Sequence, residues 1–279
     1  MAVRRHPLDP ITSFSNPKIK QVRALRQRKA RQESGLFLVE GIRPVGEAAA
    51  AAAAGRAVSI EMLLYAPERL DSEFALQLVS EQGQAGVPCY PVAPAVFESL
   101  SEKENPPGLL AVVRLDQPEI ESLNVLNFSW GVALLAPQDP GNLGTILRTI
   151  DAVGASGLLL VNDPATGRFS CDPYHPSAVR ASMGTLFWLP VVSVTFSQFA
   201  AWISERGYHL FGTSAHASQD YRTANYPRPT VLLLGSEQEG LAPQHTALCE
   251  RLVRLPMQGR ASSLNLAVAA GVMLDTMIE

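Results

Sequence analysis

The sequence predicts an α/β protein built from two domains, and three observations lead to this fold class. Apolar segments in the second half alternate with helical stretches, which is typical of a parallel sheet covered on both faces. These strands are expected at residues 132–135, 158–161, 191–194, 208–212 and 231–234. The first half alternates shorter strands and helices over roughly a hundred residues, as in a small α/β domain. A polar stretch at residues 115–128 separates the two halves and predicts a linker.

The expected elements fill two domains, residues 15–114 and residues 129–279, behind a flexible lead-in at residues 1–14. In the first domain, strands are predicted at residues 36–39, 58–65, 87–92 and 109–113. Its helices are predicted at residues 18–32, 44–54, 72–82 and 95–101. The helices of the second domain are predicted at residues 143–153, 177–183, 198–205 and 264–277. Proline and serine caps, apolar periodicity and glycine positions set these bounds.

Composition narrows the class of protein. The 279 residues are 47% hydrophobic, which excludes a mainly disordered chain. The net charge of −3 means that a nucleic acid would have to be bound by a local patch. Three scattered cysteines predict free thiols in a reducing compartment, and hence a cytoplasmic protein. The spacing of the histidines and cysteines suggests no metal site. No apolar run fits a membrane span or signal peptide.

A basic patch is expected on the helix at residues 18–32, ahead of which residues 15–17 offer a cap and a proline at the first helical position. Its cations are Lys18, Lys20, Arg23, Arg26, Arg28, Lys29 and Arg31. A run of charges is commonly a solvated helix face. The charges here have one sign and lie on one element, so binding to a phosphate backbone is a second interpretation.

The C-terminal stretch combines a short strand at residues 251–255, a polar loop with Gly259, and a helix that Ser262 or Ser263 could cap. That helix, residues 264–277, is apolar on nearly every side and is therefore predicted to be buried. Its alanines and Gly271 would allow another backbone or another subunit to approach closely.

Three loops that follow predicted strands are candidate sites, because ligands of parallel α/β sheets bind at the carboxyl ends of strands. In the first loop Asn142 stands at a predicted helix cap, and Arg148 lies opposite the apolar stripe of that helix. The second loop brackets Glu237 with two glycines, and the third contains Ser263 and Asn265. Each residue also has a purely structural explanation, as a cap, a turn or a solvent-facing side chain. The glycine spacing fits neither a dinucleotide fingerprint nor a P-loop.

Taken together, the three loops resemble the motifs of the SpoU (TrmH-like) branch of the SPOUT RNA methyltransferases. The resemblance is carried by residues 142–148, 234–241 and 255–265, in that order and spacing. Residues 178–190 resemble the segment that this family has between its first two motifs. Residues 16–20, 35–41 and 107–112 are similar to its appended substrate-binding domain, which is L30e-like.

The resemblance implies a SPOUT α/β-knot, with a deep C-terminal trefoil knot, after a small L30e-like α/β domain. It further implies a homodimer that uses S-adenosylmethionine (S-adenosyl-L-methionine) to methylate a ribose 2'-hydroxyl in structured RNA. Ribosomal RNA is the favoured substrate. The alternatives are a tRNA ribose methyltransferase and a non-catalytic RNA-binding or ribosome assembly factor that retains the fold.

Roles for single residues are carried over from the resemblance. The cofactor would be held by Leu234, Gly235, Leu255, Met257, Gly259 and Leu264. Arg148 would engage phosphate and the reacting hydroxyl, with the other polar positions of the site supplied by Asn142, Glu237, Ser263 and Asn265. Because a guanidinium stays protonated, Arg148 is expected to stabilise the developing alkoxide, and the proton acceptor is left open. The basic helix would contact the RNA backbone.

Overall fold

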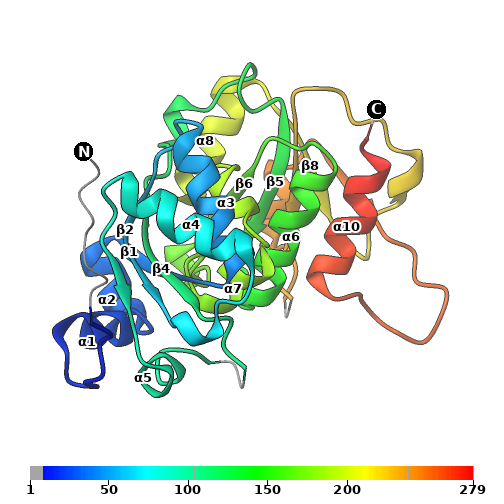
Figure 1. The fold of residues 1–279 in the computed structure, drawn as a ribbon. Coiled ribbons are helices and arrows are strands. Elements are labelled where there is room, and N and C mark those ends of the chain that lie inside the picture. The colour runs from blue at the N-terminus through cyan, green and yellow to red at the C-terminus, as the bar shows by residue number, and fades with distance from the viewer. Residues whose placement is uncertain (1–8, 103–104, 238, 279) are drawn as a thin grey trace. The chain divides into compact units, whose positions relative to one another are not determined.

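The computed structural model describes residues 9–102, 105–237 and 239–278, and the chain divides into two compact units (Figure 1). The first unit holds the described residues up to Asp116 together with Tyr174–Arg180, and the second holds the remainder. Residues 1–8 of the expected lead-in lie outside the described residues. A flexible lead-in is wrong for Ile11, because its backbone N–H donates to the Pro91 carbonyl (2.8 Å) and its side chain packs against the core.

The first unit is built on a four-stranded sheet in the order β1-β4-β2-β3. Its strands are β1 (Leu36–Glu40), β2 (Val58–Tyr65), β3 (Cys89–Pro91) and β4 (Leu109–Leu115). The central strand β4 runs antiparallel to both of its neighbours, and β3 runs parallel to β2. The alanine-rich α3 (Ile42–Ala53) packs against this sheet through buried Ala48 and Ala51, while α4 (Glu73–Gln84) and α5 (Pro94–Glu98) complete the unit.

The basic segment forms two helices, so the single predicted helix at residues 18–32 is wrong. The first, α1 (Pro17–Ala24), begins as predicted, since the Asn16 side chain accepts the Lys18 N–H (2.9 Å) and Pro17 follows it. The chain then breaks at residues 25–27 and resumes as α2 (Arg28–Ser34). Arg31 stabilises this break, since its Nη1 donates to the carbonyls of Leu25 and Arg26, both at 2.8 Å.

We expect Arg31→Ala to lower the free energy of unfolding by about 2 kcal/mol, because two backbone carbonyls would lose a charged donor. Urea denaturation of the full chain measures this change. The control is Lys20→Ala on the exposed face of α1, which should leave stability unchanged. An Arg31→Ala protein as stable as the wild type would contradict a structural role for Arg31.

The second unit contains a seven-stranded sheet in the order β7-β6-β5-β10-β8-β11-β9. Its strands are β5 (Trp130–Leu135), β6 (Leu158–Asn162), β7 (Val191–Thr195), β8 (His209–Thr213), β9 (Gln219–Asp220), β10 (Thr230–Leu234) and β11 (Arg251–Arg254). Every recorded pair is parallel, which confirms the predicted parallel sheet. Because β10 lies between β5 and β8, it brings the loop after β10 beside the loop after β5.

Helices cover the sheet of the second unit. On one face, α8 (Phe196–Arg206) packs Phe199 and Trp202 against a core that includes Ala133 and Leu135. Along β5, Val132 and Leu134 point to the opposite face and are also fully buried. The helices α6 (Pro140–Ala152) and α10 (Leu266–Thr276) pack against each other (Figure 1). There are two further short helices, α7 (Pro176–Ala181), which belongs to the first unit up to Arg180, and α9 (Pro243–Leu248) in the second unit.

Residues 117–128, which were expected to form a linker, are packed into the second unit. Ile120, Leu123 and Phe128 belong to its buried core, and Trp202 Nε1 donates to the Leu123 carbonyl (3.1 Å). Polar residues separate these three apolar positions, so the sequence shows no apolar periodicity there and their burial was not predicted. The compact units divide after Asp116.

The C-terminal helix is buried on one side, so the predicted burial on all sides is wrong for the single chain. It begins at Leu266 and is capped by Asn265, which also corrects the expected cap at Ser262 or Ser263. Ala270, Met273 and Leu274 are fully buried, whereas Val268 is 52% exposed and Leu264, just before the helix, is 40% exposed. Among the described residues, no helix has the length and apolarity that a membrane span requires.

Candidate functional site

Hydrogen bonds join the three loops that the sequence marked. Asp139 caps α6 by accepting the Asn142 N–H (2.7 Å), so the prediction that Asn142 is the cap is wrong. The Asn142 side chain is therefore available for other contacts. Its Nδ2 donates to Glu237 Oε1 (3.3 Å), and its Oδ1 accepts from Asn265 Nδ2 (2.9 Å). Glu237, Asn142 and Asn265, from three distant parts of the chain, thus form one polar cluster.

Asn265 has two functions in this cluster. Its Oδ1 accepts the backbone N–H groups of Ala267 (2.9 Å) and Val268 (3.3 Å), which caps α10. The carbonyl oxygen of the amide must face these donors, so the Nδ2 group faces Asn142. One side chain thus starts the final helix and completes the polar cluster.

Arg148 lies on the exposed side of α6, opposite the buried Leu143, Ile146, Leu147 and Ile150, as the apolar periodicity predicted. No hydrogen bond or ion pair is recorded between Arg148 and the part of the chain that the structure describes. The guanidinium is therefore accessible to a ligand.

The other residues expected at the site differ in their surroundings. Leu234 is buried at the end of β10, and Gly235 is sterically required, since a Cβ there would lie 2.2 Å from the Gly240 carbonyl carbon. Leu255 and Met257 are half-buried. Leu264, Ser263 and Gly259 are exposed, and a Cβ at Gly259 would meet open space, so the protein's own packing does not require glycine there.

The residues expected to bind RNA divide into accessible and structural cations. Lys20 is exposed, Lys29 forms an exposed pair with Glu33 (3.8 Å), and Lys18 lies over the Tyr90 ring (4.4 Å). Arg23 donates to Ser99 Oγ (2.9 Å), and Arg26 is half-buried. Arg31 is only 4% exposed, so a direct role in RNA binding is wrong for this residue.

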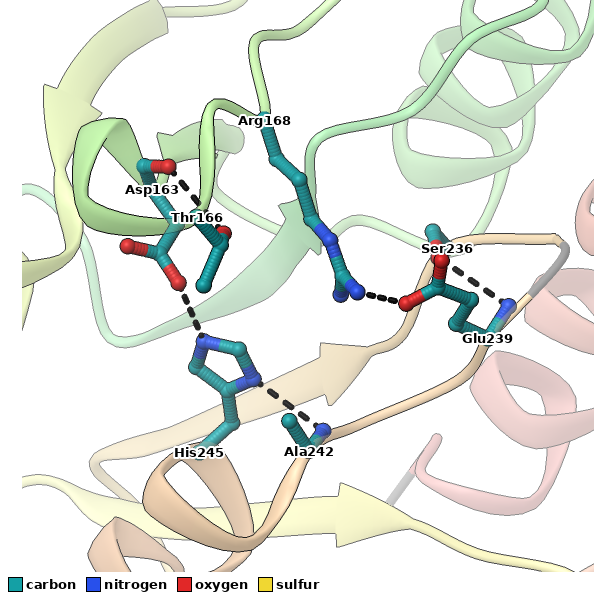
Figure 2. Close-up of polar contacts among 7 residues, drawn as sticks. All are labelled: Asp163, Thr166, Arg168, Ser236, Glu239, Ala242 and His245. Carbon is teal, nitrogen blue, oxygen red and sulfur yellow. Dashed lines mark hydrogen bonds and ion pairs between the residues drawn. The ribbon is translucent and has the colours of Figure 1, made fainter.

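A buried polar pair of the second unit was missed by the sequence analysis (Figure 2). His245 Nε2 lies 3.1 Å from Asp163 Oδ2, and both side chains are almost fully buried. His245 Nδ1 accepts the Ala242 N–H (3.1 Å), so the ring proton lies on Nε2 and is donated to Asp163. Asp163 directly follows β6, and its position after a strand was the only signal available in the sequence.

The carboxyl group of Asp163 has a lowered pKa. Burial acts to raise the pKa, but the hydrogen bonds from Thr166 and His245 outweigh it and hold the pKa below its usual value. The stabilising contribution of a carboxyl group with a lowered pKa is complete above its unfolded-state pKa of roughly 3.9. It is lost as the pH falls through the lower, folded-state value.

We expect Asp163→Ala to lower the free energy of unfolding by about 3 kcal/mol at pH 7, because the buried Nε2–H of His245 would lose its acceptor. Asp163→Asn is the milder, uncharged variant. The stability difference between wild type and Asp163→Asn should shrink as the pH falls below about 4. Denaturant titrations at pH 7 and pH 3 measure both effects, and an equal difference at the two pH values would contradict the ionised state of Asp163.

Comparison with known proteins identifies the family. Residues 129–275, more than half of the chain, match the model of the SpoU rRNA Methylase family. The chain belongs to the SpoU rRNA methylase family. This membership confirms the fold class and the class of RNA methyltransferase that the sequence predicted. Residues 16–111 match the MRM3-like substrate binding domain.

In the described part of the chain, no group of three His, Cys, Asp or Glu side chains could hold a metal ion.

Relatives match over nearly the whole chain. A 23S rRNA (uridine(2479)-2'-O)-methyltransferase of Streptomyces viridochromogenes is 34% identical, covering 93% of this chain and 88% of the relative. The 23S rRNA (guanosine(2553)-2'-O)-methyltransferase RlmP of Bacillus subtilis is 26% identical, covering 95% and 97%. The crystal structure of an AdoMet-bound rRNA methyltransferase from Sinorhizobium meliloti superposes with a TM-score of 0.84 at 33% identity, covering 96% of each chain.

Proposed function

We propose that this member of the SpoU family transfers the methyl group of S-adenosylmethionine to a ribose 2'-hydroxyl of ribosomal RNA. The observation that carries the proposal is the polar cluster of Glu237, Asn142 and Asn265, which unites the three family motifs at one place. The full-length relatives named above, which are 23S rRNA 2'-O-methyltransferases, support ribosomal RNA as the substrate.

The residues present fit the cofactor. Leu255 and Met257 offer half-buried apolar surface for the adenosine. The backbones of Gly235 and Gly240 are in close contact, which leaves no room for a side chain at residue 235. The backbone of residues 255–264 makes no hydrogen bond to the described residues, so its carbonyl groups and its N–H groups other than at Pro256 are available to an adenine edge. The cofactor supplies an activated methyl group, and the protein has only to align and polarise the hydroxyl.

We assign the following roles to this chain's own residues. Arg148 holds the phosphate of the target nucleotide and stabilises negative charge on the 2'-oxygen. The hydrogen bond between Asn142 and Asn265 fixes the first and third motif loops relative to each other. Glu237 holds the second loop beside them by accepting from Asn142. Two exposed cations of the first unit, Lys20 and Lys29, contact the RNA backbone.

Two further features of the family are proposed for this chain. A C-terminal trefoil knot would be formed by the segment that leads from β11 into α10, and a second copy would cover the exposed apolar side chains Leu264 and Val268. Val268→Asp should then convert a dimer into a monomer in analytical ultracentrifugation.

We also propose that the protein acts in the cytoplasm. Its RNA-binding domain would be residues 15–114 and its methyltransferase domain residues 129–279.

The test is methyl transfer from radiolabelled S-adenosylmethionine to purified ribosomal RNA and to tRNA, followed by alkaline hydrolysis, which 2'-O-methylation blocks. Label at alkali-resistant positions of ribosomal RNA supports the proposal. Label on tRNA alone would show that tRNA, and not ribosomal RNA, is the substrate. Label on a base would contradict methylation of the ribose. Cofactor binding without transfer to any RNA would instead favour a non-catalytic binding factor.

A further inference from the structure

Two loops of the second unit enclose a pocket to which none of the roles above is assigned. One loop follows β6 and carries Arg168 and Phe169, and the other follows β10 and carries Ser236 and Glu239. Gln138, from the loop after β5, completes the wall. Figure 2 shows the Arg168 side chain reaching across to Glu239, with Ser236 beside it. The loop after β10 also carries Glu237 of the polar cluster, so the pocket and the cluster share an element.

The loop that carries Phe169 is held in a fixed conformation. The backbones of Asp163 and Arg168 exchange two hydrogen bonds, at 2.8 and 2.9 Å. Gln138 Nε2 donates to the Phe169 carbonyl (3.0 Å), and the next residue, Ser170, donates its N–H to Asn162 Oδ1 (2.7 Å). The Phe169 ring nevertheless remains 55% exposed. An exposed ring on a fixed backbone is preorganised for stacking against a flat ligand.

The charged groups of the pocket leave hydrogen-bonding capacity unused. Arg168 Nη2 forms an ion pair with Glu239 Oε2. Arg168 Nη1 is buried and has no hydrogen-bond partner among the residues that the structure describes. A buried donor without a partner is costly, so this atom points to an acceptor supplied by a ligand. The Glu239 side chain is 60% exposed and still offers an acceptor.

These features favour one class of occupant. A phosphate would be repelled by the Glu239 carboxylate. A hydrocarbon would give the Arg168–Glu239 ion pair no hydrogen-bond partner in place of water. A neutral, planar group with donors and an acceptor on one edge would suit all three residues. It would stack on the Phe169 ring, accept a hydrogen bond from Arg168 and donate to Glu239. Unpaired RNA bases are bound in this way, by stacking on an aromatic side chain and hydrogen bonding along an edge.

We propose that this pocket binds an unpaired guanine of the RNA substrate. Guanine presents two adjacent N–H donors, which Glu239 can accept, next to a carbonyl oxygen that can accept from Arg168 Nη1. Its ring would stack on Phe169. The inference rests on the proposed function, because it places the base in the RNA that the same chain methylates.

The test uses fluorescein-labelled RNA pentamers, UUGUU, UUAUU, UUCUU and UUUUU, in fluorescence anisotropy titrations of the full chain. We expect UUGUU to bind several-fold more tightly than the other three. Phe169→Ala should weaken the binding of UUGUU about tenfold, the size of effect that loss of one base–aromatic stack produces. Glu239→Gln should abolish the preference for guanine while leaving the affinity for UUUUU unchanged.

The matched control is Phe74→Ala, since Phe74 is 57% exposed but belongs to the first unit. It should leave all four affinities unchanged, and thermal unfolding checks that each variant is folded. Equal affinities of the wild type for the four pentamers would overturn the proposal, as would an unaffected UUGUU affinity in folded Phe169→Ala.

Failure of this subsite is distinguishable from failure of the proposed function. Methyl transfer to ribosomal RNA by a wild type that shows no base preference would overturn the guanine pocket alone. A guanine preference that depends on Phe169, in a protein that transfers no methyl group to any RNA, would overturn the methyltransferase proposal and leave the pocket supported.

Discussion

Replacing Arg148 by alanine is expected to slow methyl transfer to ribosomal RNA by about 100-fold to 1,000-fold, which is the usual effect of removing a donor to a developing oxyanion. The physical reason is that negative charge develops on the 2'-oxygen as its proton leaves, and the Arg148 guanidinium would stabilise this charge. Arg148 is exposed, so the variant should fold normally. Single-turnover transfer with saturating cofactor measures the effect.

The matched control is Arg251→Ala, an exposed arginine on β11 of the same unit. It should retain full activity, and both variants should bind S-adenosylmethionine as the wild type does in calorimetry. If Arg148→Ala transferred methyl groups at the wild-type rate, the guanidinium would have no part in the reaction.

Asn265 allows the catalytic and structural contributions of one side chain to be separated. Asn265→Ala should lose both functions, lowering the free energy of unfolding by about 1 kcal/mol through the lost cap. Methyl transfer should fall at least tenfold, because Asn142 loses the donor that fixes it. Asn265→Asp keeps an oxygen for the N–H groups of α10 but removes the Nδ2 donor.

We therefore expect Asn265→Asp to be as stable as the wild type and nearly as inactive as Asn265→Ala. Thermal denaturation and single-turnover transfer, measured on the same preparations, compare the two properties. Full activity in the stable Asn265→Asp protein would show that the contact with Asn142 is unimportant for the reaction.

Features set by local pattern were predictable from the sequence. The buried parallel strands are continuous apolar runs, and the start of α1 is fixed by Asn16 and Pro17, so both were predicted correctly. The break between α1 and α2 was not predicted, because residues 25–27 are compatible with a helix and the Arg31 side chain, which bonds two carbonyls at the break, could not be placed from the sequence. Ile120 and Leu123 were likewise misassigned to a linker, since their burial depends on Trp202 and the core around it.

The site was predictable only in part, for a similar reason. The three loops were marked by glycines and polar side chains at the ends of strands, and the resemblance to a family grouped them. The hydrogen bonds among Asn142, Glu237 and Asn265 depend on the position of β10 beside β5, which no local pattern specifies. The Asp163–His245 pair joins residues 82 positions apart and has no motif. Arg168 and Phe169 lie in a loop that carried no signal.

The double role of Asn265 has a consequence for the order of events in synthesis. The amide that caps α10 is the same amide that holds Asn142, so the polar cluster and α10 form together. A nascent chain whose residues 265–276 are still inside the ribosome lacks this cluster. The three loops are therefore joined only after α10 has left the ribosome.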